Sequence, residues 1–254
     1  MSAPSRRTVG IVQARIGSTR LPAKVLLPLL GEPMLSRVLR RTSRAERLDE
    51  VVVATTDQPA DDAIVELAER EGWPVVRGSA HDVLDRYVVA ARAHDADVIV
   101  RITSDCPVID PNVIDMTIAA FDEADIDYAS NSLEPRTFPR GLDVEVISRE
   151  ALERAWREDA DPAWREHVTP FIYRHPEAFR LLAVRSEDDH SEQRWSVDTA
   201  EDYELVRRIF EAIGRDDFGW REALAVVKDH PDWMALNRHI VQKRVPPADG
   251  SQDG

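Results

Sequence analysis

The chain has 254 residues, 43% of them hydrophobic, and its 47 acidic residues outnumber its 33 Lys plus Arg to give a net charge of −14. Such acidity argues against binding to nucleic acid or to an anionic membrane surface, because both require extended basic surfaces. No apolar run approaches the ~18 residues of a membrane span, and the single Cys106 excludes an internal disulfide and fits a reducing, cytoplasmic compartment.

Apolar runs alternate with amphipathic stretches along the chain. The predicted strands are residues 9–13, 50–55, 75–76, 97–102, 142–147 and 179–184. The predicted helices are residues 33–43, 57–71, 83–94, 111–123, 149–157, 164–175, 200–213, 220–227 and 231–239. This alternation predicts βαβ units in a three-layer α/β fold, with helices on both faces of a parallel sheet. We expect one domain over residues 1–243 and a disordered tail over 244–254, which is rich in Pro, Gly, Asp and Ser.

The first predicted strand runs directly into a loop of small and basic residues. The small residues offer backbone N–H groups and hydroxyls to an anion, and they are Gly17, Ser18 and Thr19. The cations of the loop are Arg15, Arg20 and Lys24. No acid precedes Glu32, so this part of an acidic chain is locally positive and predicts a polyphosphate site. The alternative is a solvated basic turn punctuated by Pro22.

Two aspartates are candidate ligands of Mg²⁺, which prefers one or two carboxylates together with phosphate oxygens. Asp105 follows the most hydrophobic predicted strand, at the sheet edge where ligands bind; the alternative is a turn before Pro107. Thr199 suits the N-cap of the next helix, which leaves Asp198 to face the cleft, unless it caps that helix or orients a neighbour. Cys106 has no base nearby, and we interpret it as a small buried hydrophobe rather than a nucleophile.

Two further clusters are candidates for binding a second substrate. Asp143 and Glu145 share one face of a predicted strand near Arg140. They could bind sugar hydroxyls or an amine, or they could form a solvent-exposed face. Arg165 and His167 could hold a phosphate or carboxylate, whereas the alternative leaves His167 on a helix surface.

The run Gln-Ala-Arg-Ile-Gly-Ser-Thr-Arg-Leu-Pro-Ala-Lys-Val-Leu, residues 13–26, resembles the signature loop of the cytidylyltransferase family that includes CMP-sugar-acid synthetases. The resemblance is closest to the SpsF-like branch of spore coat polysaccharide biosynthesis, which shares the Glu-His-Val-Thr pattern of residues 166–169, and it covers about residues 8–213. It implies a Rossmann-like nucleotide-diphospho-sugar transferase fold with a mixed, mostly parallel sheet. It also implies that Asp105 and Asp198 hold Mg²⁺.

The same resemblance implies a set of nucleotide-binding residues, in which the segment 77–87 recognises the base. The set is Gln13, Ala14, Arg15, Gly17, Ser18, Thr19, Arg20, Lys24, Gly78, Ser79, Asp82, Val83, Leu84, Arg86, Thr103, Ser104 and Asp105. Without the resemblance, we would interpret the segment 77–87 as a loop that feeds a helix, with Asp82 as its cap and Arg86 in solvent.

The resemblance implies nucleotidyl transfer from CTP to a sugar phosphate or sugar acid, with release of pyrophosphate. In this hypothesis Lys24, Arg15 and Arg20 hold the triphosphate and neutralise the charge that grows during the reaction. The alternatives are a glycosyltransferase that uses a nucleotide-sugar and a non-catalytic nucleotide-binding module. The expected partners are CTP and a small anionic sugar, and a homodimer is compatible with the sequence.

Overall fold

The computed structural model describes residues 6–242 and 245, and within them a seven-stranded sheet has the order β5-β4-β1-β6-β8-β7-β9. Its strands are β1 (Thr8–Gln13), β4 (Glu50–Thr56), β5 (Val75–Gly78), β6 (Val98–Thr103), β7 (Tyr128–Ser130), β8 (Glu145–Ser148) and β9 (Leu181–Ala183). Strand β8 pairs antiparallel with both of its neighbours, and the other pairs of this sheet are parallel. A separate two-stranded ribbon joins β2 (Pro28–Leu29) to β3 (Glu32–Pro33). The predicted mixed, mostly parallel α/β fold is confirmed.

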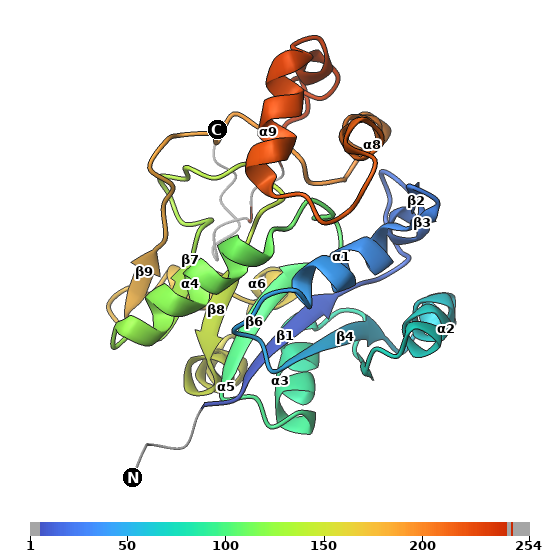
Figure 1. Cartoon of the computed structure of the whole chain (residues 1–254). Coiled ribbons are helices and arrows are strands. Elements are labelled where there is room, and N and C mark those ends of the chain that lie inside the picture. Colours follow the sequence, from blue (N-terminus) through green and yellow to red (C-terminus); the bar gives the residue numbers. More distant parts are fainter. Residues whose placement is uncertain (1–5, 243–244, 246–254) are drawn as a thin grey trace.

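Helices cover both faces of this sheet (Figure 1). They are α1 (Met34–Thr42), α2 (Asp62–Glu71), α3 (Val83–Ala93), α4 (Pro111–Glu123), α5 (Arg149–Glu158), α6 (Pro162–His167), α7 (Pro170–Tyr173), α8 (Ala200–Ile213) and α9 (Trp220–Asp229), with short 3₁₀ turns η1 (Lys24–Leu26), η2 (Pro59–Asp61) and η3 (Trp233–Ala235). Buried side chains of α1, α2, α4, α8 and α9 belong to one hydrophobic cluster, and those of α3, α5 and α7 belong to the other. The protein therefore has the three layers that the sequence predicts.

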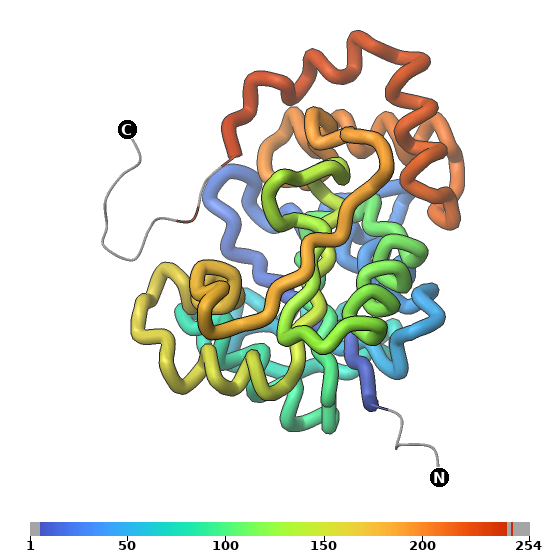
Figure 2. Tube along the Cα trace, turned by 90° about the vertical axis from the view of Figure 1, so that its left-hand side faces the viewer, coloured from blue at the N-terminus to red at the C-terminus, as the bar shows by residue number. Residues whose placement is uncertain are grey.

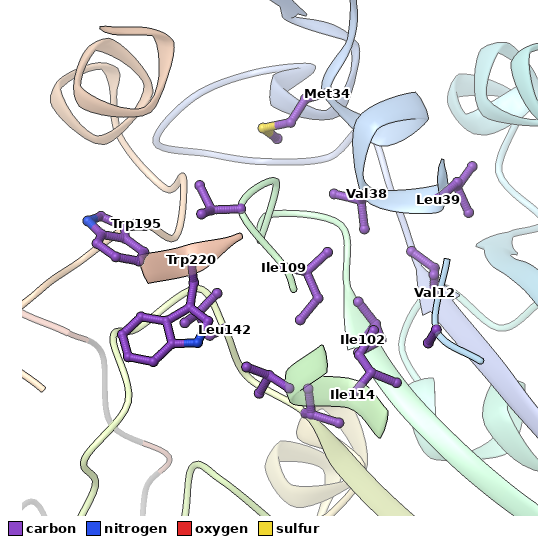
Figure 3. Close-up of a cluster of buried hydrophobic side chains, with 14 of the residues drawn as sticks. Val12, Met34, Val38, Leu39, Ile102, Ile109, Ile114, Leu142, Trp195 and Trp220 are labelled. Carbon is purple, nitrogen blue, oxygen red and sulfur yellow. The ribbon is translucent and has the colours of Figure 1, made fainter. Parts of the chain in front are cut away.

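The continuous apolar run of β4 explains how one strand serves both clusters. Successive side chains of a strand point to opposite faces, so Val51 and Val53 enter the cluster beneath α1, while Val52 and Ala54 enter the cluster beneath α3. Figure 3 shows part of the first cluster, where Val38 of α1 lies near Val12 and Ile102 of the sheet. These strands are fully buried, which holds their carboxyl ends in fixed positions.

The strand order reverses between β1 and β6. From β1 the chain passes outward through β4 to β5, then crosses back through α3 to β6 on the other side of β1. In open α/β sheets the crevice at such a reversal, beyond the carboxyl ends of the strands, is where ligands bind. A ligand site is therefore expected at the loops that follow Gln13 and Thr103.

Two long segments on the other half of the sheet run beside each other. Figure 2 shows the chain after β9 (orange) passing the loop 131–142 (yellow-green). The backbone N–H of His190 donates to the carbonyl of Thr137 (2.7 Å), and Arg140 and Arg194 form a parallel bridge. This pairing brings Arg140 next to the segment that leads to Asp198.

Gly141 is required at the centre of this pairing. Its φ is +99°, and a Cβ there would lie 2.6 Å from the backbone N of Ser196 and from the backbone C of Trp195. We expect Gly141→Ala to lower the free energy of unfolding by roughly 2–4 kcal/mol, since backbone strain and overpacking combine. Urea unfolding measures the loss. Gly214→Ala is the matched control, because Gly214 has a φ of +77° but no atom within 4 Å of its Cβ position; an equal loss in both variants would contradict the steric argument.

The structure differs from the predicted elements at several places. The helix predicted over 57–71 begins at Asp62, after η2, and the ribbon of β2 and β3 was not predicted. The strand predicted over 142–147 begins at Glu145, and the short buried β7 was not predicted. The helix predicted over 164–175 divides into α6 and α7, because Val168 has a φ of +73° and Pro170 cannot continue an α-helix. The helix predicted over 231–239 is reduced to η3. The predicted disordered tail lies outside the described residues except for Val245, whose carbonyl accepts a hydrogen bond from Arg174 (2.8 Å).

None of the helices in the described part of the chain is long and apolar enough to cross a membrane.

Candidate active site

A cavity of about 560 Å³ opens where the sheet order reverses. It is lined by the loop after β1, the loop after β6, the first turn of α3, the end of α6 and the segment before α8. Of the residues implied for nucleotide binding, those that line it are Gln13, Ala14, Arg15, Gly17, Ser18, Thr19, Arg20, Lys24, Val83, Arg86, Thr103, Ser104 and Asp105. The loop predicted to bind polyphosphate therefore forms one wall of a cavity at the expected sheet edge.

A buried carboxylate beneath the loop holds its backbone in place. Asp61 accepts a hydrogen bond from the N–H of Ile16 (2.6 Å) and another from the hydroxyl of Thr56. Ile16 in turn accepts hydrogen bonds from the N–H groups of Ser18 (2.7 Å) and Ala23 (3.3 Å). The loop is thus shaped by hydrogen bonds on its inner side, which leaves Gly17 and its neighbours at the cavity wall. Sequence reasoning did not identify Asp61, because its role depends on contacts far apart in the chain.

The ammonium group of Lys24 joins the two predicted carboxylates. Its Nζ lies 3.1 Å from Asp105 Oδ2 and 2.9 Å from Asp198 Oδ1, and it donates to the carbonyl of Val197 at 2.7 Å. The side chains of Lys24 and Asp198 are 13% and 14% exposed, so water screens this contact only weakly. The structure therefore brings together, in one cavity, a loop cation and two aspartates from distant parts of the sequence.

The pKa values of Lys24 and Asp105 are both shifted toward the charged form. Burial opposes the charge of Lys24, but Asp105 and Asp198 outweigh it and raise the pKa of Lys24. Burial likewise opposes the charge of Asp105, but Lys24 and a hydrogen bond from Thr103 lower the pKa of Asp105 below its ordinary value. Asp105 therefore stabilises the fold at pH values above its ordinary pKa, and this contribution is lost as the pH falls toward the lowered value.

Asp198 is held from behind by a buried network. Arg194 donates to Asp198 Oδ2 (2.8 Å) and to both oxygens of Asp202 (2.9 and 3.1 Å). Asp202 is fully buried and also accepts from the backbone N–H groups of Asp198 (3.0 Å) and Thr199 (3.1 Å). Thr199 and Asp202 form a capping box at the start of α8, so the predicted N-cap is confirmed and Asp198 is left to face the cavity. Sequence reasoning did not identify Arg194, although it precedes Asp198 by four residues.

The other two loop cations are more exposed than Lys24. Arg20 lies 3.2 Å from Asp198 Oδ1, and Arg15 pairs with Glu166 of α6 at 3.1 Å. Arg15 and Glu166 are each about half exposed, at 48% and 47%, so their pair adds little stability. Arg15 is therefore available to an anionic ligand at small energetic cost.

The donor set fits a metal ion only in part. Among the described residues no group of three His, Cys, Asp or Glu side chains gathers in a way that could hold one. Asp105 and Asp198 do place two carboxylates within 3.1 Å of a single point, the ammonium nitrogen of Lys24. This pair suits Mg²⁺ when phosphate oxygens complete the coordination.

Arg86 is the least expected member of the cavity wall. The side chain is 1% exposed rather than solvated, and its Nε and Nη1 have no hydrogen-bond partner in the described part of the chain. Burial lowers the pKa of Arg86, and Arg15 lowers it further. A Cβ on Gly78 would lie 3.3 Å from Arg86 Cγ, so the glycine makes room for this arginine. Unpartnered buried donors are rare in folded proteins, and here a ligand is their natural partner.

The remaining residues implied for base recognition lie outside the cavity. Asp82 caps α3 by accepting from the N–H of Asp85 (2.9 Å), and it pairs with Arg165 at 2.7 Å. Ser79 accepts hydrogen bonds from the backbone just before α3, and Leu84 is buried in the second hydrophobic cluster. The contacts of Asp82 are therefore those of the alternative, in which it caps a helix.

Some of the residues predicted to bind a second substrate line the cavity, and others lie outside it. Arg140, Asp143 and His167 line the cavity. Glu145 is buried away from it, where it pairs with Arg101 and accepts from the hydroxyl of Tyr128 (2.8 Å), so the alternative of a solvent-exposed face is wrong for Glu145. His167 is exposed at the last position of α6, as the alternative of a helix-surface residue expected. Desolvation lowers the pKa of His167, and the neighbouring Arg101 lowers it further.

Arg165 likewise points away from the cavity, since it binds Asp82 and donates to the carbonyls of Trp156 (2.9 Å) and Asp159 (2.8 Å). Cys106 is 2% exposed, and burial and the nearby Asp105 raise the pKa of its thiol well above the ordinary value. The interpretation of Cys106 as a buried, unreactive side chain agrees with this placement.

Known proteins are similar to this chain in sequence and in fold. The sequence profile described as "Cytidylyltransferase" matches residues 9–226. The spore coat polysaccharide biosynthesis protein SpsF of Bacillus subtilis is 34% identical over 240 residues, which cover 87% of this chain and 94% of SpsF. A 3-deoxy-manno-octulosonate cytidylyltransferase of Trichlorobacter lovleyi is 39% identical over 114 residues, or 44% of each chain.

A solved structure is similar over nearly the whole length. The cytidylyltransferase from Leptospira borgpetersenii superposes with a TM-score of 0.88 at 33% identity, covering 94% of this chain and all of that one. The sequence match includes the loop after β1, the loop after β6 and the start of α8. The chain therefore belongs to the cytidylyltransferase family.

Proposed function

We propose that this protein transfers a cytidylyl group from CTP to a sugar phosphate or sugar acid, releasing pyrophosphate, for the synthesis of polysaccharide or glycoconjugate precursors. The observation that carries the proposal is the contact of Lys24 with both Asp105 and Asp198 at the reversal of the sheet order. An oxygen of the acceptor forms a bond to the α-phosphorus, and the bond from that phosphorus to the pyrophosphate oxygen breaks. Family membership favours this reaction over the alternatives of a glycosyltransferase and a non-catalytic module.

The loop cations suit the triphosphate. Lys24, Arg15 and Arg20 all line the cavity and come from one loop, whose small residues leave backbone N–H groups near the same space. Charge that grows on the departing pyrophosphate is stabilised best by donors that are already in place. Lys24 is the most buried of the three cations, which suits it to the phosphate at which bonds change.

Asp105 and Asp198 would hold Mg²⁺ together with phosphate oxygens, and the ion would supply charge neutralisation at the reacting phosphate. Lys24 then exchanges its two carboxylate partners for the triphosphate. Arg194 and Asp202 keep Asp198 in place during this exchange, because their contacts lie on its other oxygen and on its backbone. Removal of divalent cations with EDTA should therefore abolish pyrophosphate release.

The acceptor follows from the relatives and from the charge of the cavity. SpsF is named for polysaccharide biosynthesis, and the second relative for transfer to 3-deoxy-manno-octulosonate, an acidic sugar. Arg140 and His167 lie in the same cavity as the candidate catalytic groups and could bind such an acid. These observations support an anionic sugar as acceptor.

The direct test is a screen for pyrophosphate release. CTP, GTP, UTP and ATP are each combined with a panel of sugar phosphates and sugar acids, with Mg²⁺ and with EDTA. We expect release with CTP and at least one anionic sugar in Mg²⁺ alone. Transfer from a nucleotide-sugar without pyrophosphate release would contradict the proposal, and a clear preference for GTP would replace cytidylyl by guanylyl transfer.

Arg86 supports a preference for cytosine. An arginine only donates hydrogen bonds, and cytosine presents two acceptors, O2 and N3, where uracil presents an N–H donor at N3. A buried donor that faces another donor loses its hydrogen bond, and such mismatches discriminate strongly. The carboxamide Oε1 of Gln13, which is also buried without a partner in the described residues, offers an acceptor for the amino group of cytosine.

We expect CTP to bind at least ~10-fold more tightly than UTP, a difference of about 1.4 kcal/mol, and we expect Arg86→Met to reduce this ratio toward one. Titration calorimetry with both nucleotides measures the ratio. Gly78→Ala should reduce it less, since its Cβ would only press on Arg86 Cγ. The control is Arg92→Met, an exposed position of the same helix. An unchanged ratio in Arg86→Met would exclude Arg86 as the residue that selects the base.

A further inference from the structure

A second cavity, of about 450 Å³, adjoins the proposed nucleotide site. Its walls come from residues 191–194, from α8 and from the segment around η3. Arg140 and Gln242 line both cavities, so the two spaces meet at these side chains. The sequence analysis identified no site here, apart from Arg140 itself.

Arg140 stands at this junction without a counter-ion in the described residues. Its backbone is fixed on both sides, because its N–H donates to Gln193 (3.0 Å) and its carbonyl accepts from Trp195 (2.7 Å). Asp143, the nearby carboxylate, is already bound by both Nη atoms of Arg136 (2.5 and 3.1 Å). Partial burial lowers the pKa of Arg140, and Arg136 lowers it further, whereas Asp143 and Glu134 act in the opposite direction without overcoming these two effects. A fixed cation of this kind is a binding group for an anion.

Arg194, another cation that lines the second cavity, is already paired. It binds Asp198 and Asp202, so it forms part of the wall between the cavities rather than a free anion site. Because Arg194 also binds Asp198, which lines the nucleotide cavity, its side chain lies between the second cavity and one of the candidate reacting groups. A molecule bound at Arg140 is therefore placed beside the phosphate that Lys24 would hold.

The rest of the second cavity is mixed in character. Leu205, Met234 and Ile240 give it apolar surface, while Ser191 and Gln193 offer hydroxyl and amide groups. A hexose with hydroxyl groups on every carbon would leave that apolar surface unmatched. Deoxy, methyl or acyl groups on a sugar match it, because burial of apolar surface is favourable.

We propose that the second cavity holds the body of the acceptor, an acidic sugar whose carboxylate or phosphate binds Arg140 and whose deoxy, methyl or acyl groups lie against Leu205, Met234 and Ile240. This inference rests on the proposed cytidylyl transfer and adds the class and position of the acceptor. It assigns nucleotide and acceptor to different cavities, so variants can disturb one without the other.

Two variants separate acceptor binding from nucleotide binding. Ala235→Trp fills the second cavity from an exposed position on η3 that does not line the nucleotide cavity. Arg140→Gln removes the charge at the junction but keeps a polar side chain. Each should weaken acceptor binding at least ~10-fold, which is the usual scale for a hydrogen bond to a charged group. Ala235→Trp, which lies outside the nucleotide cavity, should change CTP affinity less than ~2-fold. The control is Arg70→Gln, at an exposed position of α2.

Titration calorimetry on protein saturated with a CTP analogue that cannot be cleaved between the α- and β-phosphates gives the readout. The probes are 3-deoxy-manno-octulosonate, N-acetylneuraminate, glucose 1-phosphate, N-acetylglucosamine 1-phosphate and neutral N-acetylglucosamine. We expect at least one acidic probe carrying deoxy or acyl groups to bind, the neutral sugar not to bind, and both variants to weaken that binding. The carboxylate and phosphate members show which anion is used.

Three results would overturn the inference while leaving cytidylyl transfer intact: acceptor binding that neither variant changes, equal binding of the neutral sugar, or no binding of any acidic probe to nucleotide-loaded protein. Failure of the CTP analogue itself to bind would remove the proposed function and the inference together.

Discussion

Lys24→Met should lower kcat for pyrophosphate release by about 10²-fold or more while the protein remains folded. Methionine retains most of the length and apolar bulk of the lysine stem but has no charge. The ammonium group contacts Asp105, Asp198 and a backbone carbonyl, and it is the best-buried cation of the loop. If that charge serves the reacting phosphate, its loss falls on the transition state rather than on substrate binding alone.

The chain offers a matched control for this variant. Lys228, one of three lysines in the sequence, is exposed on α9, and Lys228→Met should leave turnover unchanged. Circular dichroism checks that both variants are folded. Wild-type turnover in folded Lys24→Met would remove Lys24 from the proposed machinery.

A second measurement separates a role at the phosphate from a purely structural one. In the ligand-free protein Lys24 occupies the position between Asp105 and Asp198 that a divalent cation would take. Lys24→Met leaves those carboxylates without their shared cation, so Mn²⁺ should bind the nucleotide-free variant more tightly than the wild type. Mn²⁺ titration followed by electron paramagnetic resonance would show the difference.

Local signals in the sequence predicted the central part of the fold. The bounds of α4 agree with prediction because Pro111 opens the helix behind an Asp110 cap, and those of α8 agree because Thr199 and Asp202 form a capping box. The parallel strands were recognisable because both of their faces are apolar. Strand β7 was missed because it has only three residues and is defined by its partners rather than by its own pattern.

In the candidate site, too, local sequence patterns were predictable and contacts that depend on the fold were not. The phosphate loop is continuous in sequence, and all the residues predicted from it line the cavity. Asp105 and Asp198 were recognisable from their positions after a strand and before a capped helix, but only the fold brings both to Lys24. The buried state of Arg86 was not predictable, because it depends on tertiary packing around the first turn of α3 and on the absence of a side chain at Gly78.

The supporting network could not be predicted for a further reason. The segment that contains Arg194 has no regular secondary structure, so no periodicity indicates which way this side chain points. Its partner Asp202 looks, in sequence, like an ordinary acid in the first turn of a helix. Only the packing of residues 194–202 against the η3 segment, where Asn237 also binds Asp202 (2.9 Å), shows that the pair holds Asp198.

The two carboxylates that share Lys24 should behave as one unit. Asp105 and Asp198 each contribute an oxygen to the same ammonium group, and in the proposed reaction each contributes an oxygen to the same metal ion. Removal of either carboxylate leaves an incomplete metal site, so removal of the second carboxylate lowers the activity little further. Groups that act together in this way show strongly non-additive losses.

Asp105→Asn and Asp198→Asn should therefore each lower Mg²⁺-dependent pyrophosphate release by at least about 10³-fold, several kcal/mol of transition-state stabilisation, and the double variant should be less than about tenfold worse than either. Asparagine keeps the shape of the side chain, removes its charge and replaces one of its two acceptor oxygens with a donor. Asp229→Asn, at an exposed position at the end of α9, should leave turnover unchanged. If the losses multiply in the double variant, the two aspartates act independently; if turnover survives in EDTA, they hold no metal, and Lys24 with its neighbouring arginines must neutralise the triphosphate alone.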